Sequence, residues 1–447
     1  MKKKWIITTM LCGCLTFGMG LNVSAATYEG YTQEEFDALE ATTVVKSEDS
    51  PTGYYVTFRY KDADAERVRI YGEWAFSDLA HSTVATSLNA TPEEWQDGYT
   101  VWQTSGWPTA DMALDEETGI WSYTIPLPNG TYNYRYYIGG AEGAELTDYT
   151  DAEMICDPSN PNYTYDREVE EKTGEMCLTS VYVPYDEERQ TNTTCVEEQA
   201  PREGENGTVF FEDVTLESGI STSYGVYLPY EFDENRQEAY PILVLFHGGG
   251  GYDGSWFNNG LANILDNMIA EGRIEPMIVV TPNGESFPAE NPDLRWDRDA
   301  ISDYVINYLL PHMSENYNAS TDPAFRAIGG LSQGGAAIMN AYFNHTEEFG
   351  YYIDMSSPMK ENVHADFTKP QLHDVKLYIG YGMYDFVTTQ VYFNEAKAAV
   401  EGSIFEYIYG LSDAGVEFMV NNHLPYGHQW SLWRELIVDA FDHFLWK

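Results

Sequence analysis

The chain has 447 residues, and its 71 Asp and Glu against 24 Lys and Arg give a formal net charge of −47. Nucleic-acid phosphates and anionic lipids would repel so acidic a protein, which argues against either as a partner. The hydrophobic fraction of 43% excludes global disorder. The length predicts two or three domains.

Residues 1–26 have the pattern of a secretory signal peptide. Lysines at positions 2–4 precede an apolar stretch that ends at Leu21, and small residues follow at 23–26. Cys12 stands where a lipoprotein cleavage site requires a small residue, so we expect a secreted protein without a lipid anchor. No later segment has the roughly 20 apolar residues that a membrane-spanning helix needs.

Few cysteines follow the signal peptide, namely Cys156, Cys177 and Cys195. Three is too few for a disulfide scaffold, and their spacing does not match a metal site. One disulfide with one free thiol, or three free thiols, are both compatible with the sequence.

Residues 40–167 have the sequence pattern of a β domain. Short runs of β-branched and aromatic residues occur between turn signals, at 55–60, 67–71, 121–125 and 132–136. No helical periodicity interrupts them, so we expect an all-β sandwich. Residues 168–207 are richer in Glu, Thr and Asn, and we expect a polar linker there, in which the apolar run at 181–184 is a candidate for packing on a domain.

Residues 208–447 alternate two patterns. Apolar runs typical of strands buried on both faces occur at 242–246, 278–280, 325–329, 375–379 and 416–420. Apolar residues at helical spacing separate or follow these runs, at 261–269, 301–309 and 433–444. The alternation predicts a mostly parallel sheet with helices on both faces.

A G-x-S-x-G sequence at Gly330–Gly334 lies between a predicted strand and a helix that begins with small residues. This is the context of a nucleophile elbow, a sharp turn that presents a serine hydroxyl above the sheet. A plain glycine-rich helix start is the alternative. The context favours Ser332 as a catalytic nucleophile.

A glycine-rich loop, His247–Gly251, follows the first buried strand. In hydrolases of this architecture, such a loop and the residue after the nucleophile supply backbone N–H groups to the oxyanion hole. We therefore expect Gly248, Gly249 and Gln333 to be the donors, with His247 positioning the loop. A phosphate-binding loop is disfavoured because the Gly-Lys-Ser/Thr ending is missing.

The remaining catalytic groups follow from the chain order Ser, Asp, His that is typical of this architecture. His428 lies after the last predicted strand and before the final helix, and His423 is the alternative base. Asp385 follows the penultimate strand, where it would orient the histidine. Asp374 precedes this strand and so falls at the wrong edge of the sheet, and Asp354 and Asp413 are weaker candidates for the acid.

Residues 208–447 resemble the esterase D-like carbohydrate esterases, which include feruloyl esterases, acetyl xylan esterases and relatives of enterochelin esterase. The matching segments are 240–249, 276–280, 330–335 and 427–434. The resemblance implies an α/β-hydrolase fold and maps the serine, acid and histidine of the family onto Ser332, Asp385 and His428. It implies no metal and no organic cofactor.

The upstream region resembles the immunoglobulin-like early-set module that is often fused in front of these enzymes, on residues 70–74, 119–121 and 156–161. Together the resemblances imply a secreted serine esterase that removes feruloyl or acetyl groups from plant cell-wall polysaccharide such as xylan. Trp296 and Tyr381 are expected near the mouth of its site as substrate contacts. The sequence makes no prediction about oligomeric state.

Two other functions fit parts of the sequence. The first is an acyl hydrolase on a small phenolic or siderophore-type ester, as in enterochelin esterase, although the signal peptide argues against the siderophore version. The second is a non-catalytic polysaccharide-binding protein that uses Trp74, Trp95 or Trp107. Core or loop packing is the favoured role for these tryptophans.

Overall fold

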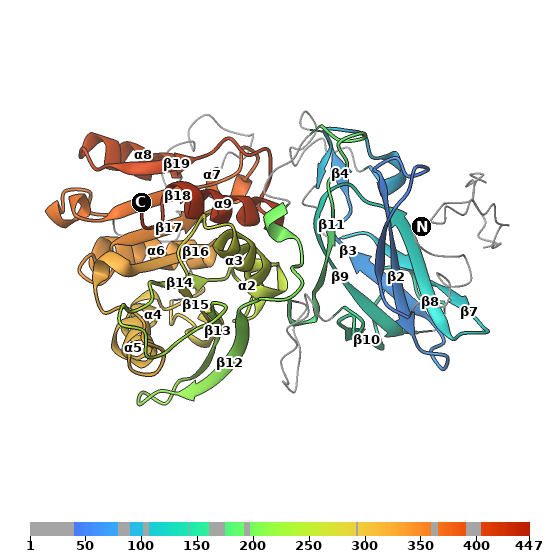
Figure 1. The fold of residues 1–447 in the computed structure, drawn as a ribbon, viewed down its shortest axis with the longest axis horizontal. Helices are drawn as coiled ribbons and strands as arrows, with labels where there is room; N and C mark the ends of the chain where they lie inside the picture. The colour runs from blue at the N-terminus through green and yellow to red at the C-terminus, as the bar shows by residue number, and fades with distance from the viewer. Residues whose placement is uncertain are drawn as a thin grey trace. The chain divides into compact units, whose positions relative to one another are not determined.

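The computed structural model describes residues 40–78, 90–101, 107–141, 143–160, 175–191, 197–291, 294–358, 365–389 and 404–447. The predicted signal peptide and Cys195 lie outside these residues. The chain forms two compact units, residues 1–197 and 198–447 (Figure 1). Within the described ranges, no helix combines the length and the apolar character needed to cross a membrane.

The first unit contains two larger antiparallel sheets and a two-stranded one, in which β4 (Phe76–Ser77) pairs with β5 (Thr100–Val101). Its main strands are β1 (Thr43–Lys46), β2 (Tyr54–Lys61), β3 (Val68–Gly72), β6 (Thr109–Asp111), β7 (Ala113–Asp115), β8 (Ile120–Pro126), β9 (Gly130–Gly139), β10 (Ala152–Ile155) and β11 (Thr179–Val183). One sheet has the order β1-β2-β8-β7, and the other β10-β9-β3-β6 with β11 also paired to β9. The strands predicted from the sequence lie in β2, β3, β8 and β9.

The two sheets share one hydrophobic core, because alternate residues of their strands point to the same interior. Phe58 from β2 and Tyr134 from β9 have ring centroids 4.7 Å apart. Trp74 and Trp95 belong to this core and are only 1% and 8% exposed, which confirms their packing role. Trp107 is half-buried and stacks on Tyr71.

Within the predicted linker over 168–207, the apolar run at 181–184 was the candidate for packing on a domain, and residues of this run belong to β11. Thr179–Val183 pairs antiparallel with β9, and Val181 and Val183 are buried in the core of the first unit. The apolar alternation of this strand covers only a few positions, so the sequence indicated packing but not the strand pairing. The boundary between the two units follows residue 197, inside the predicted linker.

A buried carboxylate joins several hydroxyl groups in the first unit. Asp157 Oδ2 accepts hydrogen bonds from the hydroxyls of Tyr134 (2.6 Å), Tyr136 (3.1 Å) and Thr42 (2.7 Å). Its Oδ1 accepts from the Ser159 hydroxyl at 2.6 Å. Both tyrosines are buried, so their hydroxyls have no access to water as an alternative partner.

The second unit is built on one eight-stranded sheet, with the order β12-β13-β15-β14-β16-β17-β18-β19. The strands are β12 (Thr208–Thr215), β13 (Ser221–Leu228), β14 (Ile242–Phe246), β15 (Ile278–Pro282), β16 (Arg326–Leu331), β17 (Tyr351–Met355), β18 (Lys376–Gly380) and β19 (Phe418–Asn421). The pairings of β12 with β13 and of β13 with β15 are antiparallel, and the others are parallel.

Helices cover both faces of this sheet. They include α2 (Ser255–Asn258), α3 (Leu261–Ala270), α4 (Arg298–Tyr304), α5 (Leu310–Tyr317), α6 (Gln333–Asn344), α7 (Phe386–Thr389), α8 (Ile404–Asp413) and α9 (Trp430–His443), which Figure 1 shows around the strands. All of β14 is buried, although its successive side chains point to opposite faces. The sequence prediction of a helix-covered, mostly parallel sheet is confirmed.

Two predicted elements differ in detail. The strand expected at 325–329 begins one residue later, because Phe325 ends a 3-10 turn that Asp322 caps through the Ala324 N–H. The helix expected at 301–309 is not purely α-helical: α4 continues into a π-helical turn, η5 (Val305–Leu309), before α5 begins.

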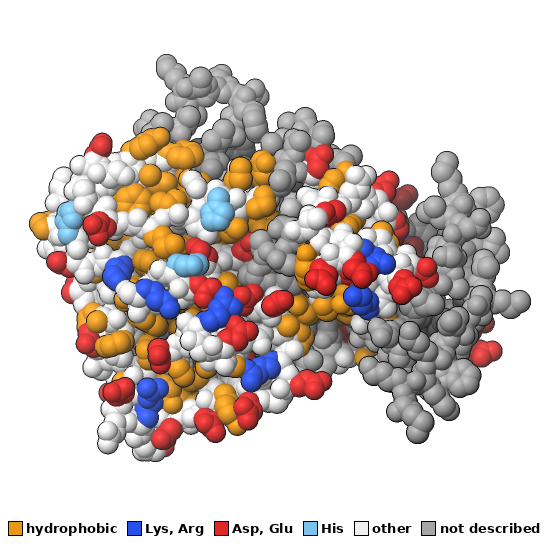
Figure 2. Space-filling model, turned by 45° about the horizontal axis from the view of Figure 1, so that its top comes forward, with side chains coloured by type: hydrophobic (Ala, Val, Ile, Leu, Met, Phe, Trp, Pro, Cys, Tyr) orange, Lys and Arg blue, Asp and Glu red, His pale blue; other side chains and the backbone are white. Residues whose placement is uncertain are grey.

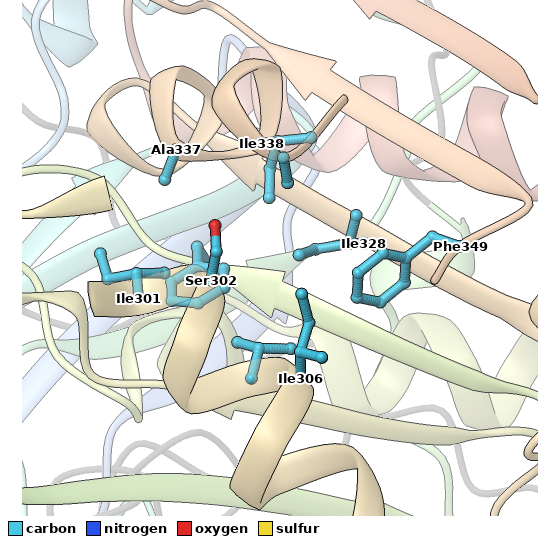
Figure 3. Close-up of a pocket in the computed structure, with 10 residues that line it drawn as sticks. Ile301, Ser302, Ile306, Ile328, Ala337, Ile338 and Phe349 are labelled. Atoms are coloured by element: carbon cyan, nitrogen blue, oxygen red, sulfur yellow. The ribbon is translucent and has the colours of Figure 1, made fainter. Parts of the chain in front are cut away.

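A small cavity lies beside this π-helical turn. Figure 3 shows Ile301, Ser302 and Ile306 on one wall and Ile328 and Ile338 on the opposite side. Its volume of about 10 Å³ is close to the minimum for one water molecule. Ser302 is the polar side chain among the lining residues, and its hydroxyl already donates to the Arg298 carbonyl. The cavity is therefore a gap in the apolar core.

The acidic side chains on one face of the molecule are spread out and do not form a single cluster (Figure 2). On the face in Figure 2, Asp and Glu side chains are dispersed, and Lys and Arg side chains lie singly between them. A dispersed charge of this kind supports solubility and is not directed at one partner.

The Asp157 network predicts a measurable loss of stability. Asp157→Ala leaves the buried Tyr134 hydroxyl without its acceptor, and leaves the Tyr136 hydroxyl only the Arg59 carbonyl, 3.1 Å away. The free energy of unfolding should therefore fall by about 2–4 kcal/mol. Asp157→Asn keeps one acceptor oxygen, so its free energy of unfolding should fall by less. Urea unfolding of the full chain measures both variants. A loss below about 0.5 kcal/mol in Asp157→Ala would contradict this role.

Candidate active site

Ser332 occupies a strained turn between β16 and α6. Its φ of 52° and ψ of −117° lie where a residue with a side chain is rarely found. The turn is tight enough that a Cβ on Gly330 would lie 2.6 Å from the carbonyl carbon of Gly334. A Cβ on Gly334 would in turn lie 2.8 Å from Cβ of Phe246 on the neighbouring strand. Glycine at both positions makes the turn possible.

Three predicted residues come together at this turn. His428 Nε2 lies 3.0 Å from Ser332 Oγ. The other ring nitrogen, Nδ1, lies 3.1 Å from Oδ1 and 3.2 Å from Oδ2 of Asp385. Because an ionised carboxylate only accepts hydrogen bonds, Nδ1 carries the proton and Nε2 is left to accept from the serine hydroxyl.

Asp385 is a fully buried carboxylate that remains ionised. Its Oδ1 accepts hydrogen bonds from the backbone N–H groups of Val387 (3.1 Å) and Thr388 (3.2 Å). Burial on its own would raise the pKa of Asp385, but His428 and these hydrogen bonds outweigh it and lower that pKa below its ordinary value.

The rival residues do not join this arrangement. His423, Asp374 and Asp413 are exposed to solvent. Asp354 is buried at the end of β17, where its Oδ1 accepts a hydrogen bond from the Ser357 hydroxyl. Burial, together with the charge of the neighbouring Asp385, raises the pKa of Asp354 to about 7. Asp354 is thus protonated under mildly acidic conditions, when Asp385 is not.

An aromatic side chain that the sequence assigned only to the core also contacts the histidine. Trp433, in the first turn of α9, packs edge-to-face against His428 with ring centroids 5.0 Å apart. Trp430 packs the same way on Trp433 at 5.1 Å. No spacing rule marked this contact, because His428 precedes α9 and only residues three or four apart within a helix are neighbours.

The glycine loop is fixed by a neutral histidine. His247 Nε2 accepts a hydrogen bond from the Gly284 N–H at 3.1 Å, so Nδ1 carries the proton and donates to the Gly248 carbonyl at 2.6 Å. Burial lowers the pKa of His247 to about 4, which keeps this ring neutral near pH 7. The Gly251 N–H also donates to the Gly248 carbonyl, at 3.2 Å.

This locked carbonyl orients the next N–H group. A trans peptide directs the N–H of Gly249 away from the Gly248 carbonyl. A Cβ on Gly248 would lie 3.3 Å from Cβ of Ser332, and a Cβ on Gly249 would lie 3.1 Å from Cγ of Gln333. Gln333 is the first residue of α6. The structure thus places all three predicted oxyanion-hole residues beside Ser332.

An ion pair that the sequence did not predict lies against the same loop. Arg295 Nε donates to Glu285 Oε1 at 2.8 Å, and the Gly250 N–H donates to the same oxygen at 2.7 Å. Burial on its own would raise the pKa of Glu285, but these hydrogen bonds outweigh it and lower that pKa. Both charged residues lie in loop sequence without a motif, so no pattern marked them.

The prediction that Trp296 and Tyr381 contact substrate is wrong. Trp296 is 1% exposed and packs edge-to-face on the His247 ring at 5.2 Å. Tyr381 is 4% exposed, and its hydroxyl accepts a hydrogen bond from Asn422 at 3.1 Å. Both follow strands whose ends approach the site, but their side chains turn into the interior.

Across the described ranges, no group of three or more His, Cys, Asp or Glu side chains is arranged to hold a metal ion.

Solved structures include one relative that spans both units. The enterobactin esterase of Shigella flexneri, crystallised in the presence of enterobactin, is 14% identical, with a TM-score of 0.51 over 94% of this chain and 99% of that chain. At this identity the similarity shows the fold, in which the second unit is α/β-hydrolase-like.

Two curated relatives match part of the chain. An endo-1,4-beta-xylanase/feruloyl esterase of Xylanibacter ruminicola is 34% identical over 140 residues, which are 30% of this chain and 19% of that protein. Endo-1,4-beta-xylanase Y of Acetivibrio thermocellus is 34% identical over 145 residues, again 30% of this chain and 13% of that protein. The chain thus spans less than a fifth of the length of these relatives.

The Esterase family model, described as "Putative esterase", matches residues 218–444. This match covers more than half of the chain and contains the whole arrangement of Ser332, His428 and Asp385 described above. The chain belongs to this esterase family.

Proposed function

We propose that the protein is a serine esterase that removes feruloyl or acetyl groups from plant cell-wall polysaccharide such as xylan. The observation that carries the proposal is the hydrogen-bonded chain from Ser332 through His428 to Asp385, with Nε2 of the histidine 3.0 Å from the serine hydroxyl. A nucleophile, its base and the group that orients the base are then all in place.

The reaction proceeds in two stages. Ser332 Oγ attacks the ester carbonyl carbon and transfers its proton to His428 Nε2, which passes it to the departing alcohol oxygen. The acyl group stays on Ser332 until a water, deprotonated by His428, releases it as the free acid. Asp385 keeps its negative charge throughout and stabilises the imidazolium, as its lowered pKa favours.

The negative oxygen that develops on the carbonyl needs donors that are already in place. We assign this oxyanion hole to the backbone N–H groups of Gly249 and Gln333, with Gly248 at its edge. His247 is then a positioning residue, because it holds the Gly248 carbonyl away from the site. Donors fixed in advance cost no reorganisation when the charge appears.

The choice of substrate is supported by the curated relatives. One is named as a xylanase/feruloyl esterase and the other as a xylanase, each 34% identical over its matched segment. The expected signal peptide would bring the enzyme to such a polymer outside the cell. We further propose that the two antiparallel sheets of the first unit are the immunoglobulin-like early-set module suggested by the sequence.

A small phenolic or siderophore-type ester is the second candidate substrate. The enterobactin esterase of Shigella flexneri matches both units of this chain, whereas the two curated relatives each match 30% of it. A higher kcat/KM on methyl ferulate than on feruloylated arabinoxylan would favour this candidate. The same catalytic groups would serve both substrates, and their presence argues against a non-catalytic binding protein.

Substitution of the nucleophile provides the first test. Ser332→Ala removes the attacking oxygen, so release of ferulate and acetate from arabinoxylan should fall by at least about 10³-fold. Chromatography of the released acids measures this. Ser412→Ala, at an exposed position in α8, is the matched control and should keep full activity. Full activity in Ser332→Ala, or no acid released by the wild type, would overturn the proposal.

The neutral state of His247 provides a second test, through the pH dependence of stability. Its pKa of about 4 in the folded protein lies below the ordinary 6.5. As the pH falls from 6.5 to 4, the unfolded chain takes up a proton that the folded protein does not, and about 3 kcal/mol of stability is lost. The raised pKa of Asp354 acts in the opposite direction, since its stability contribution is lost as the pH rises toward 7.

A variant separates the two contributions. His247→Asn keeps a donor for the Gly248 carbonyl but does not titrate, so the difference in unfolding free energy between wild type and variant should shrink by about 3 kcal/mol between pH 6.5 and 4. Urea unfolding at a series of pH values measures this difference. Parallel curves for the two proteins would show that His247 is not held neutral.

A further inference from the structure

We propose that Arg295 is a specificity-determining residue that binds a carboxylate on the alcohol part of the ester substrate. The proposal rests on the esterase function proposed above and adds a substrate class to it: esters whose alcohol is an acidic sugar or a similar hydroxy acid.

The first support is the place of this side chain. A Cβ on Gly249 would lie 3.1 Å from Cδ of Arg295 and 3.1 Å from Cγ of Gln333. Arg295 and Gln333 therefore flank the same glycine of the oxyanion loop, and Gln333 follows Ser332 directly. A substrate whose carbonyl oxygen is held by Gly249 and Gln333 would have its ester group next to the arginine.

The second support is the way the guanidinium is held. Glu285 Oε1 binds Nε of Arg295 and also the Gly250 N–H, so the arginine is tied to the backbone of the same loop. Within the described residues, no hydrogen bond is made by its two terminal amino groups. The side chain remains 48% exposed. A carboxylate needs this planar pair of donors for a bidentate interaction.

The third support is chemical. Feruloyl and acetyl groups carry no carboxylate besides the ester itself, so a carboxylate that Arg295 could bind must belong to the alcohol. Plant polysaccharides contain sugar acids as well as neutral sugars. The chain has 71 acidic residues against 24 Lys and Arg, so its overall charge repels a substrate carboxylate. The exposed guanidinium of Arg295 attracts such a carboxylate locally, at the glycine loop.

A different role has to be separated from this one. Arg295 and Glu285 would also stiffen the glycine loop if they bound no substrate at all. If Arg295 only stiffened the loop, its substitution would change kcat/KM equally for every ester, because the oxyanion hole serves all of them. Recognition of a carboxylate would affect only esters that carry one.

A pair of substrates that differ in one charge distinguishes the roles. Chlorogenate is the caffeoyl ester of quinate and has one free carboxylate, and its methyl ester has the same acyl and alcohol skeletons without the charge. We would measure kcat/KM for both on the full chain, for wild type, Arg295→Gln and Arg295→Lys. Arg236→Gln is the matched control: it removes the same charge from a half-buried arginine that packs on the Tyr240 ring.

The expected result is a change in the ratio of the two kcat/KM values. Arg295→Gln should lower the preference for chlorogenate over its methyl ester about tenfold, Arg295→Lys should lower it less, and Arg236→Gln should leave it unchanged. Raising NaCl from about 0.05 to 0.5 M should weaken the wild-type preference, since the arginine is half exposed.

Other results would overturn the proposal. If Arg295→Gln leaves the ratio unchanged, or lowers kcat/KM equally on both esters, then Arg295 only stiffens the glycine loop. If neither ester is hydrolysed, the same ratio is read from their inhibition constants against methyl ferulate hydrolysis, and equal inhibition by both also overturns it. Failure of the esterase function itself would appear separately, as wild-type activity that survives Ser332→Ala.

Discussion

The strained turn at Ser332 is the constraint on which the rest of the site depends. With φ at 52°, the residue leaves β16 and enters α6 with little room for side chains on either side. Gly334 passes so close to the end of β14 that a Cβ there would meet Phe246 and the carbonyl of His247. The same close approach places the glycine loop beside Ser332, so one packing requirement aligns both parts of the site.

The hydrogen-bond partners of the buried ionisable groups at this site determine which of them are charged. Asp385 and Asp354 are both buried near the ends of neighbouring strands, yet the pKa of Asp385 is lowered and that of Asp354 is raised to about 7. The difference follows from their partners: Asp385 has His428 and two backbone N–H donors, whereas Ser357 donates to Asp354. The hydrogen-bond partners of His247 likewise set its charge, since its two hydrogen bonds require a neutral ring.

Sequence order was enough to predict which residues meet at the turn. The chain order of serine, acid and histidine, together with strand ends recognised from apolar runs, selected Asp385 and His428 over several rivals. This works because the ends of parallel strands converge at one edge of the sheet. Short β-branched and aromatic runs likewise predicted strands of the first unit, and continuous apolar runs predicted strands of the second.

The sequence failed where side-chain direction or a loop conformation decides the outcome. Trp296 and Tyr381 do follow strand ends, but a pattern of residue types does not say whether a loop side chain faces solvent or the core. Arg295 and Glu285 come together only because their loops fold onto the glycines. The apolar run at 181–184 indicated packing on a domain, but not the pairing of β11 with β9.

Covalent labelling tests the central assignment most directly. An alkyl fluorophosphonate reacts with a serine that a neighbouring base has activated, and peptide mass spectrometry locates the adduct. One adduct on the peptide containing Ser332 is predicted, with labelling abolished in Ser332→Ala and slowed in His428→Ala. An adduct on a different residue, or labelling of Ser332→Ala at the wild-type rate, would contradict the assignment of Ser332 as the nucleophile.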